Sequence, residues 1–391
     1  MGRQRALVLT GDLGMGHHVI TEIVVGSLDR LGWSTEVLDC MSLLGRLPSK
    51  VGDWVFRRLT ATPTLYDGIH FSHFRPGGGL ASAVDWGATS RLVPVLDRHL
   101  QEHPVDLLAS TFATGSSAIA KLTAVKRTYE RPATVALCTD VSPHWLWVWE
   151  GLDLFMVTSP AAAAAVRRYS PRAPIAVVPP PVRHAFHEAP SQHDARVALG
   201  LDPSARCALV MGGGWGLGPL AATARALADE GVVVLVVAGR NPKLAQALAR
   251  EASRQPLVVP FGFTDQIPTL MAAADLVVTT PGATTCSEAR VVGRPLMLLD
   301  VIPGHGRDNI QHEHELGNAD VCDPDPARLV DSVLFALQRS VAPVPDQRVA
   351  DRWDERFAEA LAVVGIVPAE RLPSATTADD TRFVTTPEET H

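Results

Sequence analysis

The chain has 391 residues, more than one hydrophobic core usually organises, and this length predicts two domains of roughly 150 to 200 residues each. Hydrophobic residues make up 46% of the chain and charged residues only 20%, which excludes a globally disordered protein. The net charge of −7 argues against nucleic acid as a partner, because the chain lacks the overall basic field that binding to a polyanion requires.

Apolar segments of strand length alternate with amphipathic helical segments in the first half of the chain. Strands are expected at 6–10, 34–40, 105–110, 134–140 and 154–159, and helices at 17–31 and near 115–127. This alternation is typical of βαβ units, in which parallel strands form one sheet. We therefore assign residues 1–180 to an N-terminal domain.

A proline-rich segment at about 179–190 separates a second series of the same kind, since consecutive prolines disfavour both helix and central strand. We assign residues 181–345 to the second domain. A further helix is expected at 346–365, packing back towards the first domain, and the Pro-, Thr-, Ser- and Glu-rich residues 366–391 are expected to be disordered. In the second domain we expect strands at 207–214, 232–239, 257–262, 275–282 and 295–300, with helices at 218–230, 266–274 and 284–292.

The cysteines and the apolar segments indicate the compartment. Five cysteines are spread along the chain without a C-x-x-C motif, and an odd number without a pairing pattern is typical of a reducing compartment. We expect small core residues rather than disulfides. No apolar run approaches the roughly 18 to 20 residues of a transmembrane helix, and the N-terminal residues lack a signal-peptide pattern. These features predict a cytoplasmic location. The cysteines are Cys40, Cys138, Cys207, Cys286 and Cys322.

A glycine-rich segment follows the expected strand that begins at Cys207. It contains Gly213, Gly214 and Trp215, and Pro219 occupies a position suited to the first residue of a helix. Glycines let the backbone approach a phosphate, and a helix N-terminus supplies unpaired N–H groups there. The alternative is a tight turn, but a turn does not need so many glycines. We expect a phosphate-binding loop.

A second segment of this kind contains Gly282, Thr284, Thr285 and Glu288. It places hydroxyls at a helix start and a carboxylate one turn inside the helix. Such a carboxylate can accept hydrogen bonds from both hydroxyls of a ribose. The alternative is a capping box in which Thr285 is the N-cap and Glu288 is residue N3.

The first strand leads into a third glycine-containing loop, with Gly14 and Gly16 followed by His17. Ligands bind at this edge of parallel sheets. The spacing is G-x-x-G-x-G rather than the G-x-G-x-x-G of dinucleotide-binding folds, which disfavours a dehydrogenase. Neutral imidazole can remove the proton of an acceptor hydroxyl, so we expect His17 to be a general base. The alternative is a histidine without a chemical role.

Asp140 and His144 follow the strand expected at 134–140 and lie at the same sheet edge. Either side chain could orient the base or the acceptor. The alternatives are a strand-end cap for Asp140 and a buried polar residue for His144. No cofactor motif is found, and the only D-x-D sequence, at Asp323 to Asp325, indicates a helix N-cap rather than a metal site.

Residues 41–60 interleave large apolar side chains with Arg46, Lys50, Arg57 and Arg58. A basic amphipathic segment of this kind is typical of peripheral contact with a membrane surface. The alternative is an ordinary helix packed on its domain, with the stems of the arginines covering apolar surface. We therefore expect a cytoplasmic protein that associates with membranes if the first interpretation holds.

Several motifs, in order, resemble those of one group of enzymes. The sequences MGGGWGLGP, AGRNPKL, GFTDQIPTLMAAADLVVTTPG and SEARVVGRPLML, together with GMGH at 14–17, are similar to glycosyltransferases typified by monogalactosyldiacylglycerol synthase and bacterial diacylglycerol glucosyltransferases. The transferase that forms lipid II for peptidoglycan is more distant. The resemblance extends over nearly the whole chain up to about residue 330.

The resemblance implies a GT-B fold, α/β with two Rossmann-like domains whose parallel sheets face each other across a cleft. The first domain would bind the acceptor and the second a nucleotide-sugar donor. It also implies an inverting transfer of a hexose from a UDP-sugar to an acceptor hydroxyl, without metal. The resemblance assigns His17 as the base, Glu288 to the ribose, Phe263 to the uracil, and Asn309 to the sugar.

Two departures from the family motifs concern the substrates. His305 replaces a residue of the family's Gln-Glu pair on the sugar side, and Phe112 replaces a histidine on the acceptor side. A lipid acceptor resembling diacylglycerol is favoured. The alternatives are a soluble small-molecule acceptor, an epimerase of the same fold that acts on the nucleotide sugar, and a sensor that binds the nucleotide sugar without turnover.

Overall fold

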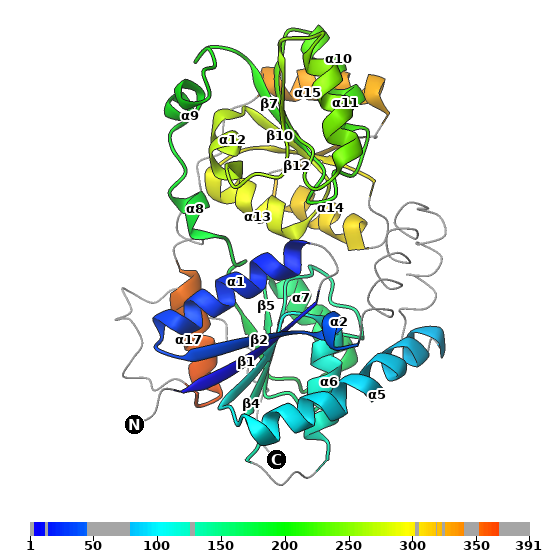
Figure 1. Ribbon diagram of the computed structural model, residues 1–391, viewed down its shortest axis with the longest axis vertical. Coiled ribbons are helices and arrows are strands. Elements are labelled where there is room, and N and C mark those ends of the chain that lie inside the picture. The colour runs from blue at the N-terminus through cyan, green and yellow to red at the C-terminus, as the bar shows by residue number, and fades with distance from the viewer. Residues whose placement is uncertain are drawn as a thin grey trace, which may run out of the picture. The chain divides into compact units, whose positions relative to one another are not determined.

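The structure is a computed structural model that describes residues 4–11, 15–44, 79–125, 130–301, 305–317, 319–322, 325–339 and 352–366. It divides into two compact units, one formed by Met1–Pro181 with Asp351–His391 and the other by Val182–Ala350. Each unit contains a six-stranded sheet of parallel strands, with helices on both faces (Figure 1). The predicted α/β class with two Rossmann-like domains is therefore confirmed, and the arrangement of the two sheets across a cleft stays a prediction.

The first unit has the strand order β2-β1-β3-β4-β5-β6. The chain runs from β1 outward to β2 and then returns to the other side of β1 to form β3, so the order reverses between β1 and β3. The strands are β1 (Arg5–Thr10), β2 (Ser34–Asp39), β3 (Leu107–Ser110), β4 (Ala133–Cys138), β5 (Leu154–Val157) and β6 (Ile175–Val177). The helices are α1 (Met15–Arg30), α2 (Cys40–Leu43), α5 (Gly79–Glu102), α6 (Ala113–Thr123), α7 (Pro160–Tyr169) and α17 (Trp353–Val363).

Both faces of this sheet are covered, because successive side chains of each central strand point to opposite faces. Leu7 and Leu9 of β1 pack with α5, α6 and α7 on one face. Ala6 and Val8 pack with α1 and α17 on the other face. The strands are therefore continuously apolar, which explains why the sequence shows them as unbroken hydrophobic runs.

The helix α17 comes from the end of the chain and packs on α1 within the first unit. Trp353 and Phe357 are buried there, and the Trp353 Nε1–H donates to Ser27 Oγ at 2.9 Å. Ser27 Oγ in turn donates to Asp354 Oδ1 at 2.6 Å. The helix α17 therefore belongs to the first unit by contact although it follows the second unit in sequence.

The second unit has the strand order β12-β11-β10-β7-β8-β9, with the reversal between β7 and β10. Its strands are β7 (Cys207–Met211), β8 (Val233–Val237), β9 (Val258–Phe261), β10 (Leu276–Thr279), β11 (Leu296–Leu299) and β12 (Ala319–Cys322). Its helices are α8 (His184–His187), α9 (Gln192–Ala198), α10 (Leu220–Asp229), α11 (Pro242–Ala252), α12 (Ile267–Ala273), α13 (Ala283–Val292), α14 (His305–Glu315) and α15 (Pro326–Arg339). As in the first unit, alternate residues of β7 pack against helices on opposite faces.

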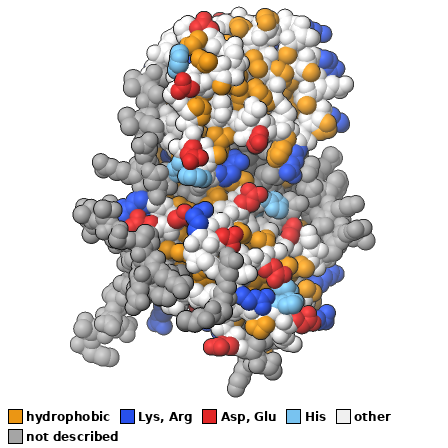
Figure 2. All heavy atoms as spheres, turned by 60° about the vertical axis from the view of Figure 1, so that its left-hand side comes forward, with side chains coloured by type: hydrophobic (Ala, Val, Ile, Leu, Met, Phe, Trp, Pro, Cys, Tyr) orange, Lys and Arg blue, Asp and Glu red, His pale blue; other side chains and the backbone are white. Residues whose placement is uncertain are grey.

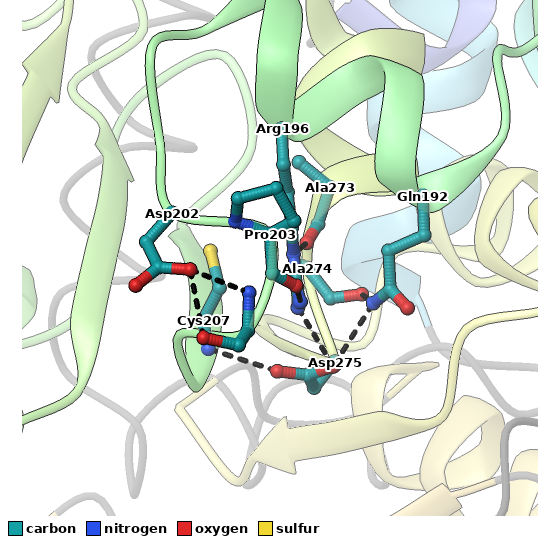
Figure 3. A network of polar contacts seen from close by, with 9 residues as sticks. Gln192, Arg196, Asp202, Pro203, Cys207, Ala273, Ala274 and Asp275 are labelled. Carbon is teal, nitrogen blue, oxygen red and sulfur yellow. Dashed lines mark hydrogen bonds and ion pairs between the residues drawn. The ribbon is translucent and has the colours of Figure 1, made fainter.

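A polar network ties α9 to the amino ends of β7 and β10 (Figure 3). Asp275 accepts from Arg196 Nη2 at 2.8 Å, from Gln192 Nε2 at 2.9 Å and from the Cys207 backbone N–H at 2.9 Å. The buried Arg196 also donates to the carbonyls of Ala273 and Pro203. The two glycine-rich loops follow the carboxyl ends of these strands, whereas this network lies at the amino ends. It therefore fixes α9 to the sheet rather than binding a ligand.

Charged side chains of both signs are intermixed over the face drawn in Figure 2. All five cysteine side chains are buried, as predicted for small core residues. Of the basic segment at 41–60, residues from 45 onward lie outside the described residues, as does the tail from 367. Among the helices described, none is both long and apolar enough to cross a membrane. The expected N-cap is present: Asp325 Oδ1 accepts from the Arg328 N–H at 3.3 Å at the start of α15.

Candidate functional site

The first part of the candidate site lies at the carboxyl ends of β1 and β3, where the strand order of the first unit reverses. Crevices at such reversals are the usual ligand sites of open parallel sheets. His17, in the first turn of α1, follows β1, and Thr111 follows β3 directly. The His17 Nδ1–H donates to the Thr111 carbonyl at 2.9 Å. A carbonyl oxygen can only accept, so Nδ1 carries the proton and Nε2 is the nitrogen that can take one.

Two aromatic rings surround the His17 imidazole. The Phe112 ring meets it edge-on with 5.1 Å between centroids, and the Trp147 ring lies at 6.4 Å. Both aromatic side chains are buried. Phe112, predicted to lie on the acceptor side, therefore packs against the imidazole ring of the candidate base. A side chain at Gly11 would place its Cβ 2.4 Å from the Phe112 ring, so this arrangement requires the glycine.

Asp140 and His144 lie in the loop that follows β4. Asp140 Oδ2 accepts from Trp147 Nε1–H at 2.8 Å, so this carboxylate holds the tryptophan that packs beside His17. The Thr111 carbonyl, not Asp140, is the partner of His17 Nδ1. The half-buried His144 accepts at its carbonyl from the Trp147 backbone N–H at 2.9 Å. Of the two predicted loop glycines, Gly16 lies in α1 and is exposed, and Gly14 lies outside the described residues.

The second part of the candidate site lies at the carboxyl ends of β7 and β10, where the order of the second sheet reverses. The glycine-rich loop 212–218 follows β7 and folds onto the residues after β8. Arg240 N–H donates to the Gly214 carbonyl at 2.8 Å, and Asn241 Nδ2 donates to the Trp215 carbonyl at 3.3 Å. Gly213 has a φ of +64°. The glycines are therefore needed both for positive φ and for close packing of two loops.

The start of α13 lies beside this loop. Thr280, after β10, places its Oγ1 4.0 Å from where a Cβ on Gly213 would be. Gly282 is the N-cap of α13 and makes no side-chain cap, so Thr284 and Thr285 lie inside the first turn. The capping-box interpretation with Thr285 as N-cap is therefore wrong, because the helix begins earlier. The first N–H groups of α13 have no partner within the helix.

Glu288 is buried one turn further along α13 and pairs with Arg183. The guanidinium donates to Glu288 Oε1 from Nη2 at 3.0 Å and from Nε at 3.3 Å. Burial raises the pKa of Glu288 from 4.5 to about 7, although the charge and hydrogen bonds of Arg183 act in the opposite direction. Arg183 also lies over the Phe186 ring at 4.9 Å. The carboxylate predicted to hold a ribose therefore already has a cationic partner.

Three further predicted donor residues have different surroundings. Asn309 of α14 is buried, and its Nδ2 donates to the Pro281 carbonyl at 2.8 Å, which fixes α14 to the loop before α13. Phe263 is 58% exposed, and the Arg240 guanidinium lies 4.6 Å from its ring centroid. His305 is the first residue of α14, but its side chain lies outside what the structure describes. The described residues contain no group of three metal-ligating side chains.

The second unit matches the model of a known domain family. Residues 209–322 match the glycosyltransferase family 28 C-terminal domain. These residues include both glycine-rich elements and Glu288. The chain is also 29% identical over 335 residues to a probable monogalactosyldiacylglycerol synthase of Glycine max, covering 80% of this chain and 62% of that protein. The chain thus spans less than two thirds of the length of this relative.

Solved structures of glycosyltransferases share the fold. The chain resembles Arabidopsis thaliana UGT89C1 complexed with UDP, with a TM-score of 0.62, 16% identity, and coverage of 94% of this chain and 100% of that one. It also resembles Acinetobacter baumannii MurG, with a TM-score of 0.53, 12% identity, and coverage of 94% and 99%. The expected GT-B fold is therefore confirmed.

Sequence reasoning did not identify the residues that hold the predicted ones in place. Arg183 lies in the proline-rich segment that we interpreted only as a linker, and its partner Glu288 is 105 residues away. Thr111 acts through its backbone carbonyl, which no side-chain pattern can indicate. Trp147 was visible only as an apolar residue in a loop. The sequence held a signal for Arg183 alone, because the segment PPPVRHAF that contains it also resembles the glycosyltransferase group.

Proposed function

We propose that this protein is a glycosyltransferase that transfers a hexose from a UDP-sugar to an acceptor hydroxyl by a single inverting displacement without a metal ion. One observation supports the proposal most directly: a candidate base and two candidate phosphate-binding elements follow the strands at which the order of each sheet reverses. His17 lies beside Thr111 in one unit, and the two glycine-rich elements adjoin in the other. The family 28 match of the second unit supports the same assignment.

In the second unit the donor diphosphate would lie between the loop 212–218 and the start of α13. Unpaired backbone N–H groups and the positive end of the helix dipole would stabilise the charge that develops on the departing UDP. Glu288 would accept from the ribose hydroxyls, with Arg183 beside it as a fixed positive charge. Phe263 and its partner Arg240 would lie next to the uracil.

In the first unit His17 Nε2 would remove the proton of the acceptor hydroxyl as its oxygen attacks the anomeric carbon from the face opposite UDP. The bond to the acceptor forms as the bond to the phosphate oxygen breaks, so the anomeric configuration inverts. A lipid acceptor is favoured because the relatives include proteins named as monogalactosyldiacylglycerol synthases. We also propose, from the interleaved basic and apolar side chains of residues 41–60, that the protein is cytoplasmic and contacts a membrane surface through this segment.

The test is a panel of UDP- and TDP-sugars with EDTA present, offered with diacylglycerol in vesicles or with soluble aglycones. Formation of a glycoside of inverted anomeric configuration, measured by NMR of the product, is expected with a UDP-sugar. Isomerisation of the sugar nucleotide without an acceptor would indicate an epimerase instead, and transfer only to soluble aglycones would overturn the lipid acceptor. Binding of UDP without any turnover would indicate a sensor.

Replacing His17 by Ala should lower turnover by about 100-fold or more, the usual contribution of a general base, while UDP affinity stays the same. His18→Ala is the matched control, since it removes the neighbouring imidazole of the same helix and should leave turnover close to that of the unmodified protein. Undiminished turnover of the His17 variant would remove His17 from this role.

A further inference from the structure

Three buried threonine hydroxyls form a cluster next to His17, at the carboxyl ends of β1 and β3. Thr21 Oγ1 lies 2.9 Å from Thr10 Oγ1, 2.7 Å from Thr111 Oγ1 and 2.7 Å from the His17 carbonyl oxygen. The three residues are at most 4% exposed. They come from β1, from α1 and from the residue that follows β3, so one hydroxyl cluster joins the three elements that form this part of the site.

The directions of these hydrogen bonds follow from counting protons. Thr21 has one hydroxyl proton and two acceptors for it, the His17 carbonyl and Thr10 Oγ1, so this proton is shared between them. The hydroxyl of Thr111 is then the donor to Thr21 Oγ1. For Thr111 the other acceptor within reach, the Leu9 carbonyl, is more distant at 3.4 Å. Thr21 is therefore the central member of the cluster, which accepts from Thr111 and donates to the His17 carbonyl and to Thr10.

The cluster holds His17 at two points. The His17 carbonyl is bound by Thr21, and the His17 ring nitrogen Nδ1 is bound by the backbone carbonyl of Thr111, whose hydroxyl is bound by the same Thr21. The contacts form a closed ring from His17 through Thr21 and Thr111 back to His17. A neutral imidazole can carry its proton on either nitrogen, and the partner of one nitrogen decides which. The position of the Thr111 carbonyl therefore decides the tautomer of His17.

We propose that Thr21 is a positioning residue that keeps the Thr111 carbonyl against Nδ1 of His17 and so maintains the tautomer with an unprotonated Nε2. The tautomer itself follows from the described contacts, and only its catalytic consequence rests on the proposed function. Without the central hydroxyl, the Thr111 side chain and the first turn of α1 lose their common partner. The ring then exchanges between tautomers, and part of the population has no lone pair on Nε2.

The first experiment needs no substrate. The full-length protein is labelled with 15N-histidine, and the two ring nitrogens of each histidine are distinguished by two-bond 15N–1H correlation spectra. The His17 signals are assigned by their loss in a His17→Gln variant. The expected result is a protonated Nδ1 in the unmodified protein and in Thr21→Ser, which keeps the hydroxyl. Thr21→Val has nearly the same volume without the hydroxyl and is expected to show averaged nitrogen shifts or a protonated Nε2.

Ser27→Ala is the matched control. Ser27 is a buried residue of the same helix whose hydroxyl oxygen lies 3.0 Å from the Ile23 carbonyl oxygen and 2.6 Å from Asp354 Oδ1, so this change also removes a buried hydroxyl from α1. It should leave the His17 tautomer unchanged. A protonated Nε2 in the unmodified protein would overturn the proposal, even if Thr21→Val does not fold. An unchanged tautomer in folded Thr21→Val would also overturn it.

The second experiment measures the catalytic consequence. Thr21→Val should lower kcat by about tenfold, which is less than the loss of about 100-fold or more expected on removing the base itself, with little change in the KM for the donor. Thr21→Ser should restore most of the rate. A tautomer that responds as expected in a protein without any transferase activity would refute the proposed function but not the positioning role. Full activity in Thr21→Val with an altered tautomer would show that the tautomer does not matter for turnover and would overturn the catalytic part.

Discussion

The buried pair of Glu288 and Arg183 gives a quantitative prediction for stability as a function of pH. Burial raises the pKa of the Glu288 carboxyl in the folded protein from 4.5 to about 7. Between these values the unfolded chain has released the proton and the folded chain retains it, so the folded state binds more protons. Stability must then fall as the pH rises from about 4.5 to 7, and the loss is complete above the folded pKa.

The magnitude follows from the same shift. Each pKa unit corresponds to about 1.4 kcal/mol, so the free energy of unfolding should fall by about 3 kcal/mol as the pH rises through this range, as an upper value. Glu288→Gln removes the titrating group and keeps the size and shape of the side chain. The two proteins should have similar stability at pH 5, where Glu288 is protonated, and the Gln variant should be more stable at pH 8.

The assay is urea unfolding of both proteins at several pH values between 5 and 8, followed by tryptophan fluorescence. Other groups also titrate in this range, but their contribution cancels in the difference between the two proteins. Arg183→Ala is the companion variant: removing the cation that lowers the pKa of Glu288 should move the transition to higher pH. A difference between the unmodified protein and Glu288→Gln that does not change with pH would refute the reasoning.

Three other changes have defined outcomes. Gly239→Ala places a Cβ 2.6 Å from the Gly214 carbonyl oxygen, at a residue whose φ is +58°. The affinity for UDP, measured by calorimetry, should fall at least tenfold, which corresponds to a loss of binding free energy on the order of 1.4 kcal/mol. Gly200→Ala has a similar φ of +68° with open space around it and should leave UDP affinity unchanged, so equal effects of both changes would contradict a role for the loop packing. Trp353→Ala should destabilise the first unit by about 3–5 kcal/mol in urea unfolding, whereas Trp86→Ala, at a side chain 70% exposed, should cost little. Burial raises the pKa of Cys40 and Cys207 to about 12, so few of these thiols are deprotonated at pH 8 in the folded protein. A disulfide reagent should therefore react slowly with the native protein, whereas all five thiols should react once the protein is unfolded. A rapidly reacting thiol in the folded protein would contradict this.

Much of the fold could be predicted from the sequence, because the central strands of a parallel sheet are buried on both faces and appear as continuous apolar runs. Each strand of the first unit from β1 to β5 was predicted within a few residues. The edge strands β6 and β12 were not predicted, since they have only three and four residues, β6 leads directly into the proline-rich segment, and Asp320 interrupts the apolar residues of β12. The 24-residue helix α5 was also not predicted, because Pro94 and the internal Gly87 weaken its helical pattern.

The sequence by itself predicted which segments are suited to bind phosphate and hydroxyl groups, because glycines, helix starts and a histidine after a strand are local features. Only the tertiary structure decided their partners. The order of the strands, which no local pattern contains, brings Thr111 to His17 across 94 residues and Gly213 to Thr280 across neighbouring strands. It also pairs Glu288 with Arg183, so that burial and one opposing cation, rather than the residue type, set the pKa of the carboxyl near neutrality.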